Sequence, residues 1–324
     1  MAAPVAYLGP EGTFTHIAAR RAAKPTDAPV IAKPSVPDVV ESVVNGEARS
    51  GVIAIENSVE GVVNASLDQL IFRPNDLTII EEIAVQISFD AYRGIGAESE
   101  AQTIGSHPHA LAQCKRYIQE LRLPVESFPS TAAAVKAAEN RSELIALGAP
   151  GLSDDYSVKV IKQGVQDYHA VTRFVHFQLA STPRYETSTE RRNDASRSWK
   201  TTLVITPPMS AAGVLTRVFS CFSDRGINVL SVNSRPLADH PGAYAFVVTL
   251  ATAGDSPSLG YAALDLMHTG NHLKHLGSYP SDSISKELAM RRPFDAPSGS
   301  ISASTPYDLI VSTFPGLTLP SEDD

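Results

Sequence analysis

The first half of the chain repeats one local pattern, in which a short apolar run ends in a polar turn and leads into a segment with helical spacing. The pattern occurs in YLGPEGTFTHIAARRAAK (7–24), GVIAIENSVEGVVNASLDQLI (51–71), IGSHPHALAQCKRYIQEL (104–121) and ESFPSTAAAVKAAEN (126–140), and ELIALGAP (143–150) adds a further strand. Repeated strand-turn-helix units predict an α/β sheet. Ligands of such sheets bind at the carboxyl ends of the strands, where these polar turn residues are concentrated.

Length and charge narrow the class of protein. The chain has 324 residues, which predicts two to three domains, and its 35 acidic and 27 basic residues give a formal net charge of −8. This negative charge does not favour nucleic acid as a partner. Cys114 and Cys221 form no CxxC pair, so we expect no structural zinc and no disulfide framework, as is typical of a reducing compartment. No apolar run approaches the roughly 20 residues of a membrane span, so we predict a cytoplasmic protein without a membrane partner.

The second half differs in organisation. Residues 181–199 have almost no aliphatic side chains and many charges, which predicts a linker. From 200 to 281 the segments TTLVITPP, AAGVLTRVFSCFSDRG, INVLSVNSRP, GAYAFVVTLAT, GYAALDLMHTG and HLKHLGSYP follow in the order βαββαβ. This order predicts a ferredoxin-like domain. Residues 282–324 are rich in Ser, Pro and charge and predict a flexible tail, in which YDLIVSTF (307–314) could form one short ordered piece.

Two of the polar turns combine groups that suit a polar ligand. Thr13 lies at the predicted start of the first helix, and Glu56, Asn57 and Ser58 follow directly after the second strand. A carboxylate, an amide and a hydroxyl within three residues could bind a polar substrate. Helix capping and an ordinary turn are the simpler structural interpretation of the same residues.

The third turn, SHPHALAQ (106–113), offers a hydroxyl and an amide at helical spacing. Ser106 and Gln113 are seven residues apart, so on one helix they would lie two turns apart on the same face and could reach one ligand. A capping serine and a surface glutamine would give the same pattern. His107 and His109 would diverge on a helix, so this spacing does not predict a metal site.

The fourth feature is the segment YHAVTRFVHFQL (168–179), which has the composition of a strand. Thr172 and Phe174 would share one face of this strand, with Arg173 on the opposite face. The chain contains no nucleophile elbow, P-loop, GxGxxG or HExxH motif. Helix N-termini and hydroxyl groups remain as the available chemistry, and they fit a small anionic substrate and no cofactor.

The order of these segments identifies a family. YLGPEGTFTH, AIENSVEGVV, SHPHALAQC, STAAAV and TRF, followed by SRP and LGSYP, closely resemble the prephenate dehydratases, and the resemblance covers residues 4 to 281. It implies a catalytic domain (1–180) with two α/β lobes like a type 2 periplasmic-binding protein, and a C-terminal ACT domain (200–281). Lobe one would hold residues 1–80 and 160–180 and lobe two 81–159, with the substrate in the cleft between them.

The resemblance also implies roles for single residues. The family reaction removes carbon dioxide and water from prephenate to give phenylpyruvate, and the threonine of TRF, here Thr172, would donate a hydrogen bond to the leaving hydroxyl. Asn57, Ser106 and Gln113 would orient the substrate and the leaving group. The residues that would bind the substrate are Thr13, Glu56, Ser58, His107, Ser130, Thr131, Arg173 and Phe174.

Feedback control by phenylalanine is a further implication. The effector would bind between two subunits of a dimer or tetramer, at Ala212, Gly213, Val214 and Leu215 of one subunit and Asn233, Ser234, Arg235 and Pro236 of the other. The glutamate of the common ESRP motif is replaced by Asn233. Because the linker looks flexible, we expect control to act largely through subunit packing rather than along the chain. We expect deletion of residues 198–324 to remove this control while sparing basal activity.

Two alternatives remain open. An arogenate dehydratase would perform the same chemistry on a substrate in which an ammonium replaces the keto group. A non-catalytic amino-acid sensor or solute-binding protein would share the two-lobed fold, although it would have no reason to retain Thr172, Arg173 and Phe174 together with Ser106 and Gln113.

Overall fold

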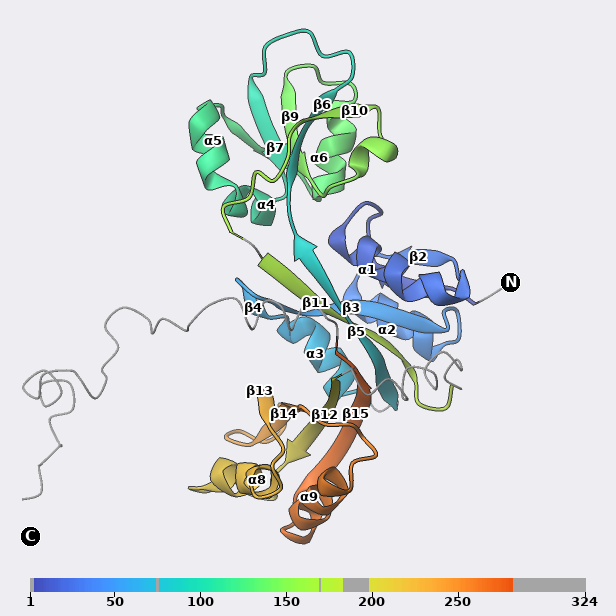
Figure 1. The fold of residues 1–324 in the computed structure, drawn as a ribbon, viewed down its shortest axis with the longest axis vertical. Coiled ribbons are helices and arrows are strands. Elements are labelled where there is room, and N and C mark those ends of the chain that lie inside the picture. The colour runs from blue at the N-terminus through green and yellow to red at the C-terminus, as the bar shows by residue number, and fades with distance from the viewer. Residues whose placement is uncertain (1–2, 74–75, 169, 183–197, 282–324) are drawn as a thin grey trace, which may run out of the picture. The chain divides into compact units, whose positions relative to one another are not determined.

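Lobe one is built on a mixed sheet. The computed structural model describes residues 3–73, 76–168, 170–182 and 198–281 (Figure 1). The strand order of this sheet is β2 (Val30–Lys33), β1 (Val5–Leu8), β3 (Ser50–Asn57), β11 (Ala170–Leu179) and β5 (Leu77–Ile87), and β4 (Gly61–Val62) pairs with β3. β1 is parallel to β2 and β3, whereas β11 is antiparallel to β3 and β5. The helical segments of lobe one are α1 (Phe14–Ala23), η1 (Lys24–Thr26), α2 (Val36–Val44) and α3 (Asn64–Ile71).

Helix α1 begins where its sequence predicts. The side chain of Thr13 caps the helix, because its Oγ1 accepts a hydrogen bond from the backbone N–H of His16 at 3.3 Å. Ala18, Ala19 and Ala22 are buried against β1, β3 and β5. Their small side chains let the helix approach the sheet closely, so the N-terminus of α1 is fixed beside the ends of β1 and β3.

Lobe two has a sheet of its own. Its strand order is β10 (Val158–Lys162), β6 (Asp90–Gly94), β9 (Leu144–Gly148), β7 (Thr103–Ser106) and β8 (Val125–Ser127). Its helical segments are α4 (Pro108–Gln113), α5 (Lys115–Leu121), α6 (Thr131–Ala138) and η2 (Leu152–Asp154). β5 and β11 of lobe one pair along their whole length, so the chain leaves that sheet after residue 87 and returns at residue 170. The expected boundaries at residues 80 and 160 therefore differ from the structure.

The helix expected over residues 106–121 is two helices. Cys114, with φ −123° and ψ 30°, separates α4 from α5, and its side chain is buried in the core of lobe two. The carboxylate of Asp167 accepts hydrogen bonds from the backbone N–H groups of Lys115 at 2.9 Å and Arg116 at 3.1 Å. A residue more than fifty positions away thus caps α5, which no local spacing could predict.

The C-terminal region has the predicted βαββαβ order. Its elements are β12 (Trp199–Thr206), α8 (Val214–Ser223), β13 (Val229–Pro236), β14 (Tyr244–Leu250), α9 (Pro257–His268) and β15 (His272–Pro280). The strands form an antiparallel sheet in the order β13-β14-β12-β15, which leaves β13 at an edge. Most of the expected linker (183–197) and the expected tail (282–324), including YDLIVSTF, lie outside the described residues.

The C-terminal sheet packs directly on lobe one. Val204, Leu276 and Tyr279 share a buried cluster with Ile79 and Val175 of the lobe-one sheet. The backbones of β15 and β5 approach so closely that a Cβ added at Gly277 would lie 2.2 Å from the carbonyl oxygen of Ile79. The C-terminal region is therefore joined to lobe one by a packed interface within one chain, and the flexible-looking linker is not their only connection.

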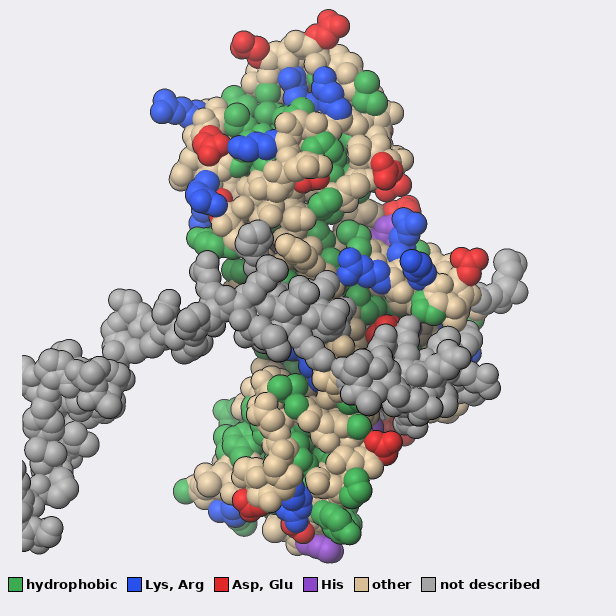
Figure 2. All heavy atoms as spheres, viewed as in Figure 1, with side chains coloured by type: hydrophobic (Ala, Val, Ile, Leu, Met, Phe, Trp, Pro, Cys, Tyr) green, Lys and Arg blue, Asp and Glu red, His purple; other side chains and the backbone are tan. Residues whose placement is uncertain are grey.

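Charged side chains are interspersed on the surface. On the face drawn in Figure 2, Lys and Arg side chains lie among Asp and Glu side chains in small groups, which agrees with the modest net charge. Within the ranges that the structure describes, none of the helices combines the length and the apolar character needed to cross a membrane.

Candidate active site

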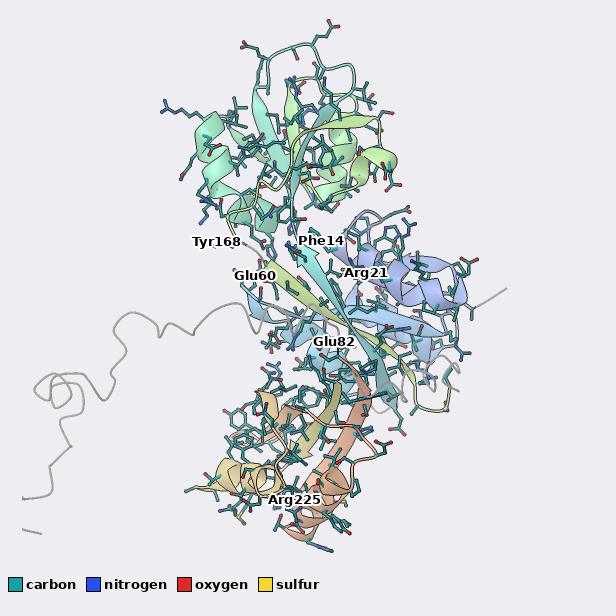
Figure 3. The ribbon with its side chains drawn as sticks, in the orientation of Figure 1. Phe14, Arg21, Glu60, Glu82, Tyr168 and Arg225 are labelled. Carbon is teal, nitrogen blue, oxygen red and sulfur yellow. The ribbon has the colours of Figure 1, made fainter. Side chains whose placement is uncertain are left out.

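A cavity of about 450 Å³ lies between the lobes, at the ends of the strands where ligands were expected. Lobe one contributes the end of β1, the start of α1, β3 and β11. Lobe two contributes α4 and the start of α6 (Figure 3). Of the residues predicted from the sequence, the cavity is lined by Thr13, Asn57, His107, Gln113, Ser130, Thr131, Thr172 and Phe174.

Thr172 and Asn57 form the polar centre of the lobe-one wall. They are cross-strand partners on β11 and β3, and the Asn57 Nδ2 donates to the Thr172 Oγ1 at 2.9 Å. The pairing register of the two strands shifts just beyond them, between Arg173 and Phe174, which leaves Ile55 unpaired in the ladder. This bulge lets both Ala54 and Asn57 face the cavity, although a regular strand would place them on opposite faces.

The hydrogen bonds of Asn57 fix the direction of the Thr172 hydroxyl. The Asn57 Oδ1 accepts from the backbone N–H groups of Val59 at 2.8 Å and Glu60 at 3.0 Å. Its Nδ2 must then be the group that faces Thr172, so the threonine oxygen acts as an acceptor in that bond. The hydroxyl proton of Thr172 remains available to a molecule in the cavity.

The N-termini of two helices also line the cavity. Thr13 caps α1, and Ser130 caps α6 by accepting from the backbone N–H of Ala133 at 3.0 Å. The loop before α1 contacts the first turn of α6, because a Cβ added at Gly12 would lie 3.0 Å from the Cβ of Ala132. The positive ends of both helices therefore favour anionic groups in this part of the cavity.

Glu60 and His109 also line the cavity, although neither was predicted from the sequence to be a site residue. Glu60 of lobe one accepts a hydrogen bond from the Gln113 Nε2 at 3.4 Å, and its other oxygen lies 3.3 Å from the Nδ1 of His109. These contacts join the lobes across the cavity. Glu60 is labelled in Figure 3. Glu60 and its two partners belong to different lobes and come together only in the folded chain, so their spacing in the sequence does not predict the contact.

The two histidines of α4 do not diverge as expected. His107 precedes the helix as its N-cap residue, and its Nδ1 accepts from the backbone N–H of His109 at 3.3 Å. Its ring therefore contacts that of His109 edge to face, with 5.0 Å between the ring centroids. Burial lowers the pKa of His107, the neighbouring His109 lowers it further, and Glu60 acts in the opposite direction. The neutral imidazole is thus favoured at the cavity wall.

The apolar part of the cavity is aromatic. Phe174, Phe14 and Phe89 line it, and the rings of Phe14 and Phe89 pack edge to face with their centroids 5.5 Å apart. Phe14 begins α1, and Phe89 lies where the chain passes from lobe one to lobe two. A ring-shaped ligand would fit between these side chains.

Ser106 is not placed as its spacing suggested. It is the last residue of β7 rather than part of the helix, it is fully buried, and its hydroxyl donates to the carbonyl oxygen of Leu147 at 2.6 Å. Ser58 is also structural, since its Oγ accepts from the backbone N–H of Val171 at 2.9 Å. Neither residue lines the cavity.

Glu56 and Arg173 lie on the other side of the sheet. Arg173 faces away from Thr172 and Phe174, as the strand alternation predicted, and its guanidinium is paired with the Glu56 carboxylate. A direct contact of these two residues with a ligand in the cavity is therefore not supported. In the described part of the chain, no group of three or more His, Cys, Asp or Glu side chains is arranged to hold a metal ion.

Comparison with known proteins places the chain in a family. The family model described as prephenate dehydratase matches residues 5–182, which is more than half of the chain. The chain belongs to the prephenate dehydratase family. The prephenate dehydratase of Bacillus subtilis (strain 168) is 32% identical over 285 residues, covering 86% of this chain and 98% of the relative.

Solved structures agree with this membership. The prephenate dehydratase of Arthrobacter aurescens, determined in complex with L-Phe, is 28% identical and superposes with a TM-score of 0.72, covering 88% of this chain and 97% of that one. A protein described as GqqA, a novel type of quorum quenching acylase, superposes with a TM-score of 0.75 at 22% identity, covering 87% of this chain and 99% of that one. That second likeness shows the fold alone. The expected combination of two α/β lobes and a βαββαβ region is confirmed.

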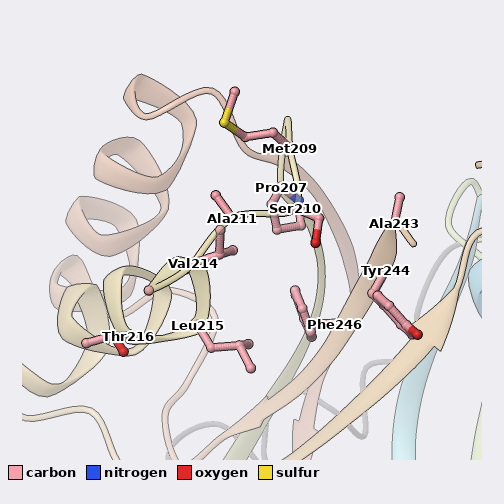
Figure 4. Close-up of a pocket in the computed structure, with 11 residues that line it drawn as sticks. Pro207, Met209, Ser210, Ala211, Val214, Leu215, Thr216, Ala243, Tyr244 and Phe246 are labelled. Carbon is pink, nitrogen blue, oxygen red and sulfur yellow. The ribbon is translucent and has the colours of Figure 1, made fainter. Parts of the chain in front are cut away.

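A second cavity, of about 250 Å³, lies in the C-terminal region of this prephenate dehydratase family member (Figure 4). Gly213, Val214 and Leu215 line it, as expected for an effector site, together with Tyr244 and Phe246. The expected second half of that site, Asn233 to Pro236, is on the edge strand β13 and does not line this cavity within one subunit. Instead, Arg235 forms a bidentate ion pair with Asp68 of α3, with both N···O distances at 2.7 Å.

Proposed function

We propose that this chain converts prephenate to phenylpyruvate, carbon dioxide and water in the cavity between its lobes. The observation that supports this most directly is the Thr172 hydroxyl, which Asn57 holds with its proton directed away from the Asn57 amide. In the reaction the bond to the ring carboxylate breaks, its electron pair completes the aromatic ring, and the ring hydroxyl leaves as water. One proton is consumed overall. Thr172 would stabilise the departing hydroxyl as a positioned hydrogen-bond donor.

The rest of the cavity suits the rest of the substrate. Prephenate has two carboxylates, and the N-termini of α1 and α6, with Thr13, Ser130 and Thr131, would bind an anionic group. Phe174, Phe14 and Phe89 would pack against the ring. We expect the carboxylate that leaves as carbon dioxide to be held the more weakly, because strong hydrogen bonds to it would oppose its loss of charge.

Arogenate is the second candidate substrate. Its ammonium would find a complementary carboxylate in Glu60, which lines the cavity beside Gln113. The purified protein is incubated with each substrate, and phenylpyruvate or phenylalanine is followed as the product. A higher kcat/KM with prephenate supports the first proposal, and a preference for arogenate that is lost in Glu60→Gln supports the second. If neither substrate is turned over, both proposals are contradicted, and the non-catalytic amino-acid sensor remains as the alternative.

Thr172 gives the direct test of the mechanism. We expect Thr172→Ala to lower kcat by about 10² to 10⁴, the range typical for loss of a positioned proton donor, and Thr172→Ser to retain much more activity. Circular dichroism and the melting temperature check that both variants are folded. A kcat for the alanine variant equal to that of the wild type would refute the assignment. Because we expect no cofactor, dialysis against a chelator should leave the rate unchanged.

Phenylalanine regulation is part of the proposal, and the C-terminal region would be an ACT domain. The supporting observations are the cavity at Gly213 and the exposed edge strand β13, whose Leu230 and Val232 are 43% and 36% exposed. Pairing of this edge with a second copy would make a homo-oligomer and place Asn233 near the partner's cavity. A cytoplasmic location, expected from the cysteine usage, belongs to the same proposal.

Gly213→Val tests this regulation by filling the cavity. We expect the variant to lose inhibition by phenylalanine and to keep its basal kcat. Gly226→Val is the matched control, since Gly226 also has a positive φ and lies beyond the other end of α8, with open space around it. The control should keep its inhibition. If the wild type itself does not respond to phenylalanine, the replacement of the family glutamate by Asn233 has removed the control.

A further inference from the structure

Four alternating charges connect the C-terminal region with the sheet of lobe one. The Lys200 Nζ of β12 lies 2.7 and 2.9 Å from the two carboxylate oxygens of Glu82 on β5. Glu82 is labelled in Figure 3. The Arg173 Nη1 lies 3.8 Å from the same carboxylate, and the Arg173 Nη2 pairs with Glu56. The Glu82 side chain is 1% exposed and that of Lys200 is 9% exposed, so this pair is shielded from water.

The inner end of this charge network is attached to the catalytic pair. Arg173 follows Thr172 on β11, Glu56 precedes Asn57 on β3, and the register pairs Thr172 with Asn57 and Arg173 with Glu56. The Arg173–Glu56 ion pair therefore joins the same two strands at the next position, on the opposite face of the sheet. A change in that ion pair would displace the backbone at Thr172 and Asn57, beside the bulge at Ile55, where the ladder is already irregular.

Two carboxylates lie within ion-pair distance of Arg173, and the pair with Glu56 is the closer of the two. Its pairing with Glu56 is close, whereas Glu82 is 3.8 Å away and is held by Lys200. Its Nε is buried and has no hydrogen-bond partner among the described residues, so the guanidinium can take another arrangement without losing a bond at that atom. Loss of a close ion pair from a buried carboxylate is costly, so Glu82 deprived of Lys200 would attract Arg173 more strongly.

We propose that Lys200 and Glu82 are positioning residues for the reaction. By holding Glu82, Lys200 leaves Arg173 paired with Glu56, and this pairing keeps Thr172 and Asn57 in register for catalysis. The packing of the C-terminal region on lobe one would thereby affect the positions of Thr172 and Asn57 in the same chain. This inference rests on the proposed function, because the activity of Thr172 is its main readout.

The test compares two lysines that join the same two parts of the chain. In Lys200→Met the Glu82 carboxylate loses its close ion pair with Lys200, and we expect kcat to fall about tenfold with a smaller change in KM. Lys274→Met is the matched control. The Lys274 Nζ donates to the carbonyl oxygens of Leu70, Ile71 and Arg73 at 3.1 to 3.2 Å, at the end of α3 rather than on β5 or β11. We expect this control to lose stability as well, with kcat within twofold of the wild type.

A double variant separates positioning from folding. Glu82→Gln combined with Lys200→Met removes both buried charges, a change that proteins often tolerate. Glu82 then no longer competes with Glu56 for the Arg173 guanidinium. We expect kcat to recover to within about threefold of the wild type. A folded Lys200→Met with wild-type kcat would overturn the proposal, and so would a double variant as slow as the single one.

A structural readout makes the inference independent of turnover. In a crystal structure of Lys200→Met, we expect the Arg173 guanidinium to pair with Glu82 and the Asn57–Thr172 bond to be longer than 2.9 Å. Retention of the Arg173–Glu56 pair would refute the inference even if the wild type proved inactive. Absence of wild-type activity together with the predicted shift of Arg173 would refute the proposed function and leave the charge network in place.

Discussion

Asn57 decides what the Thr172 hydroxyl can do. Two backbone N–H groups occupy the Asn57 Oδ1, so its amide nitrogen faces the threonine and the threonine proton points elsewhere. A threonine hydroxyl is a weak acid, so its usefulness depends on this fixed direction more than on its pKa. In the proposed mechanism, Thr172 acts through its orientation rather than through strong acidity.

Asn57→Asp tests this orientation with almost no change in shape. One carboxylate oxygen would still accept from Val59 and Glu60, but the other would now accept the proton of Thr172. The hydroxyl would then be turned away from the substrate, and we expect kcat to fall about as far as in Thr172→Ala, with the melting temperature within a few degrees of the wild type. Steady-state kinetics at pH 7.5 measure this. Near-normal kcat in a folded Asn57→Asp would contradict the orientation argument.

His16 is buried beside the loop that precedes α1 and should make stability depend on pH. Its Nδ1 accepts from the backbone N–H of Gly12 at 3.0 Å. Burial lowers the pKa of His16 below the ordinary 6.5. The charges of Glu11 and Asp155 act against this shift, and that of Arg20 adds to it. Protonation would break the bond to Gly12. Because the unfolded chain takes up this proton more readily, the contribution of His16 to stability is full above pH 6.5 and is lost as the pH falls through its folded-state pKa.

His16→Asn keeps an acceptor near the position of Nδ1 but cannot titrate. We expect the wild-type melting temperature to fall more steeply between pH 7 and pH 5 than that of the variant, as measured by thermal unfolding at a series of pH values. Parallel pH curves for the two proteins would show that His16 does not contribute to the acid sensitivity.

At the scale of elements, local rules predicted what lies at the ends of strands and the starts of helices. Thr13, Ser130 and Thr172 line the cavity because a strand end or a capping position is set by neighbouring residues. Ser106 differs because α4 begins two residues later than the spacing suggested, which moves it into β7. Glu60 and His109 meet only because two separate lobes face each other, and the bulge at Ile55 depends on the partner strand.

The loop before α1 is one of the places where the lobes touch, and Gly12 lies at this contact. An alanine there would place its Cβ 3.0 Å from both the Ala132 Cβ and the Leu152 Cδ2, at a φ of +78°. Gly46 has a similar φ of +76° with no atom within 4 Å of its Cβ position, so Gly46→Ala reports the backbone strain alone.

We expect Gly46→Ala to lower the free energy of unfolding by about 1 kcal/mol and to leave catalysis unchanged. Gly12→Ala should cost about 1 to 3 kcal/mol more through overpacking and should also lower kcat/KM, since it separates the N-termini of α1 and α6. Urea unfolding and initial rates provide the two measurements. Equal effects of the two substitutions on stability and on kcat/KM would show that the contact at Gly12 can accommodate a methyl group and is not tightly packed.

At the scale of the whole molecule, the structure reverses one expectation from the sequence. A charged, aliphatic-poor stretch after residue 180 suggested a C-terminal region attached only by a flexible connection. The buried cluster that joins Val204, Leu276 and Tyr279 to Ile79 and Val175, and the buried Lys200–Glu82 pair, show that the region completes the core of lobe one. The composition of a linker gives no information about whether the two parts that it connects pack together.

Deletion of residues 198–324 should therefore not give an active, unregulated enzyme. It would expose Ile79 and Val175 to solvent and leave the Glu82 carboxylate without Lys200. We therefore expect a poorly soluble protein that either melts at a temperature lower by about 10 °C or more or shows no cooperative unfolding transition. A chain that ends at residue 281 is the control, because it keeps every contact described for β12 and β15, and we expect it to melt and turn over like the wild type. Thermal unfolding, light scattering and initial rates on both chains decide the matter. A soluble, fully active 1–197 fragment would show that lobe one is stable alone, and that the charge network from Lys200 is dispensable for placing Thr172.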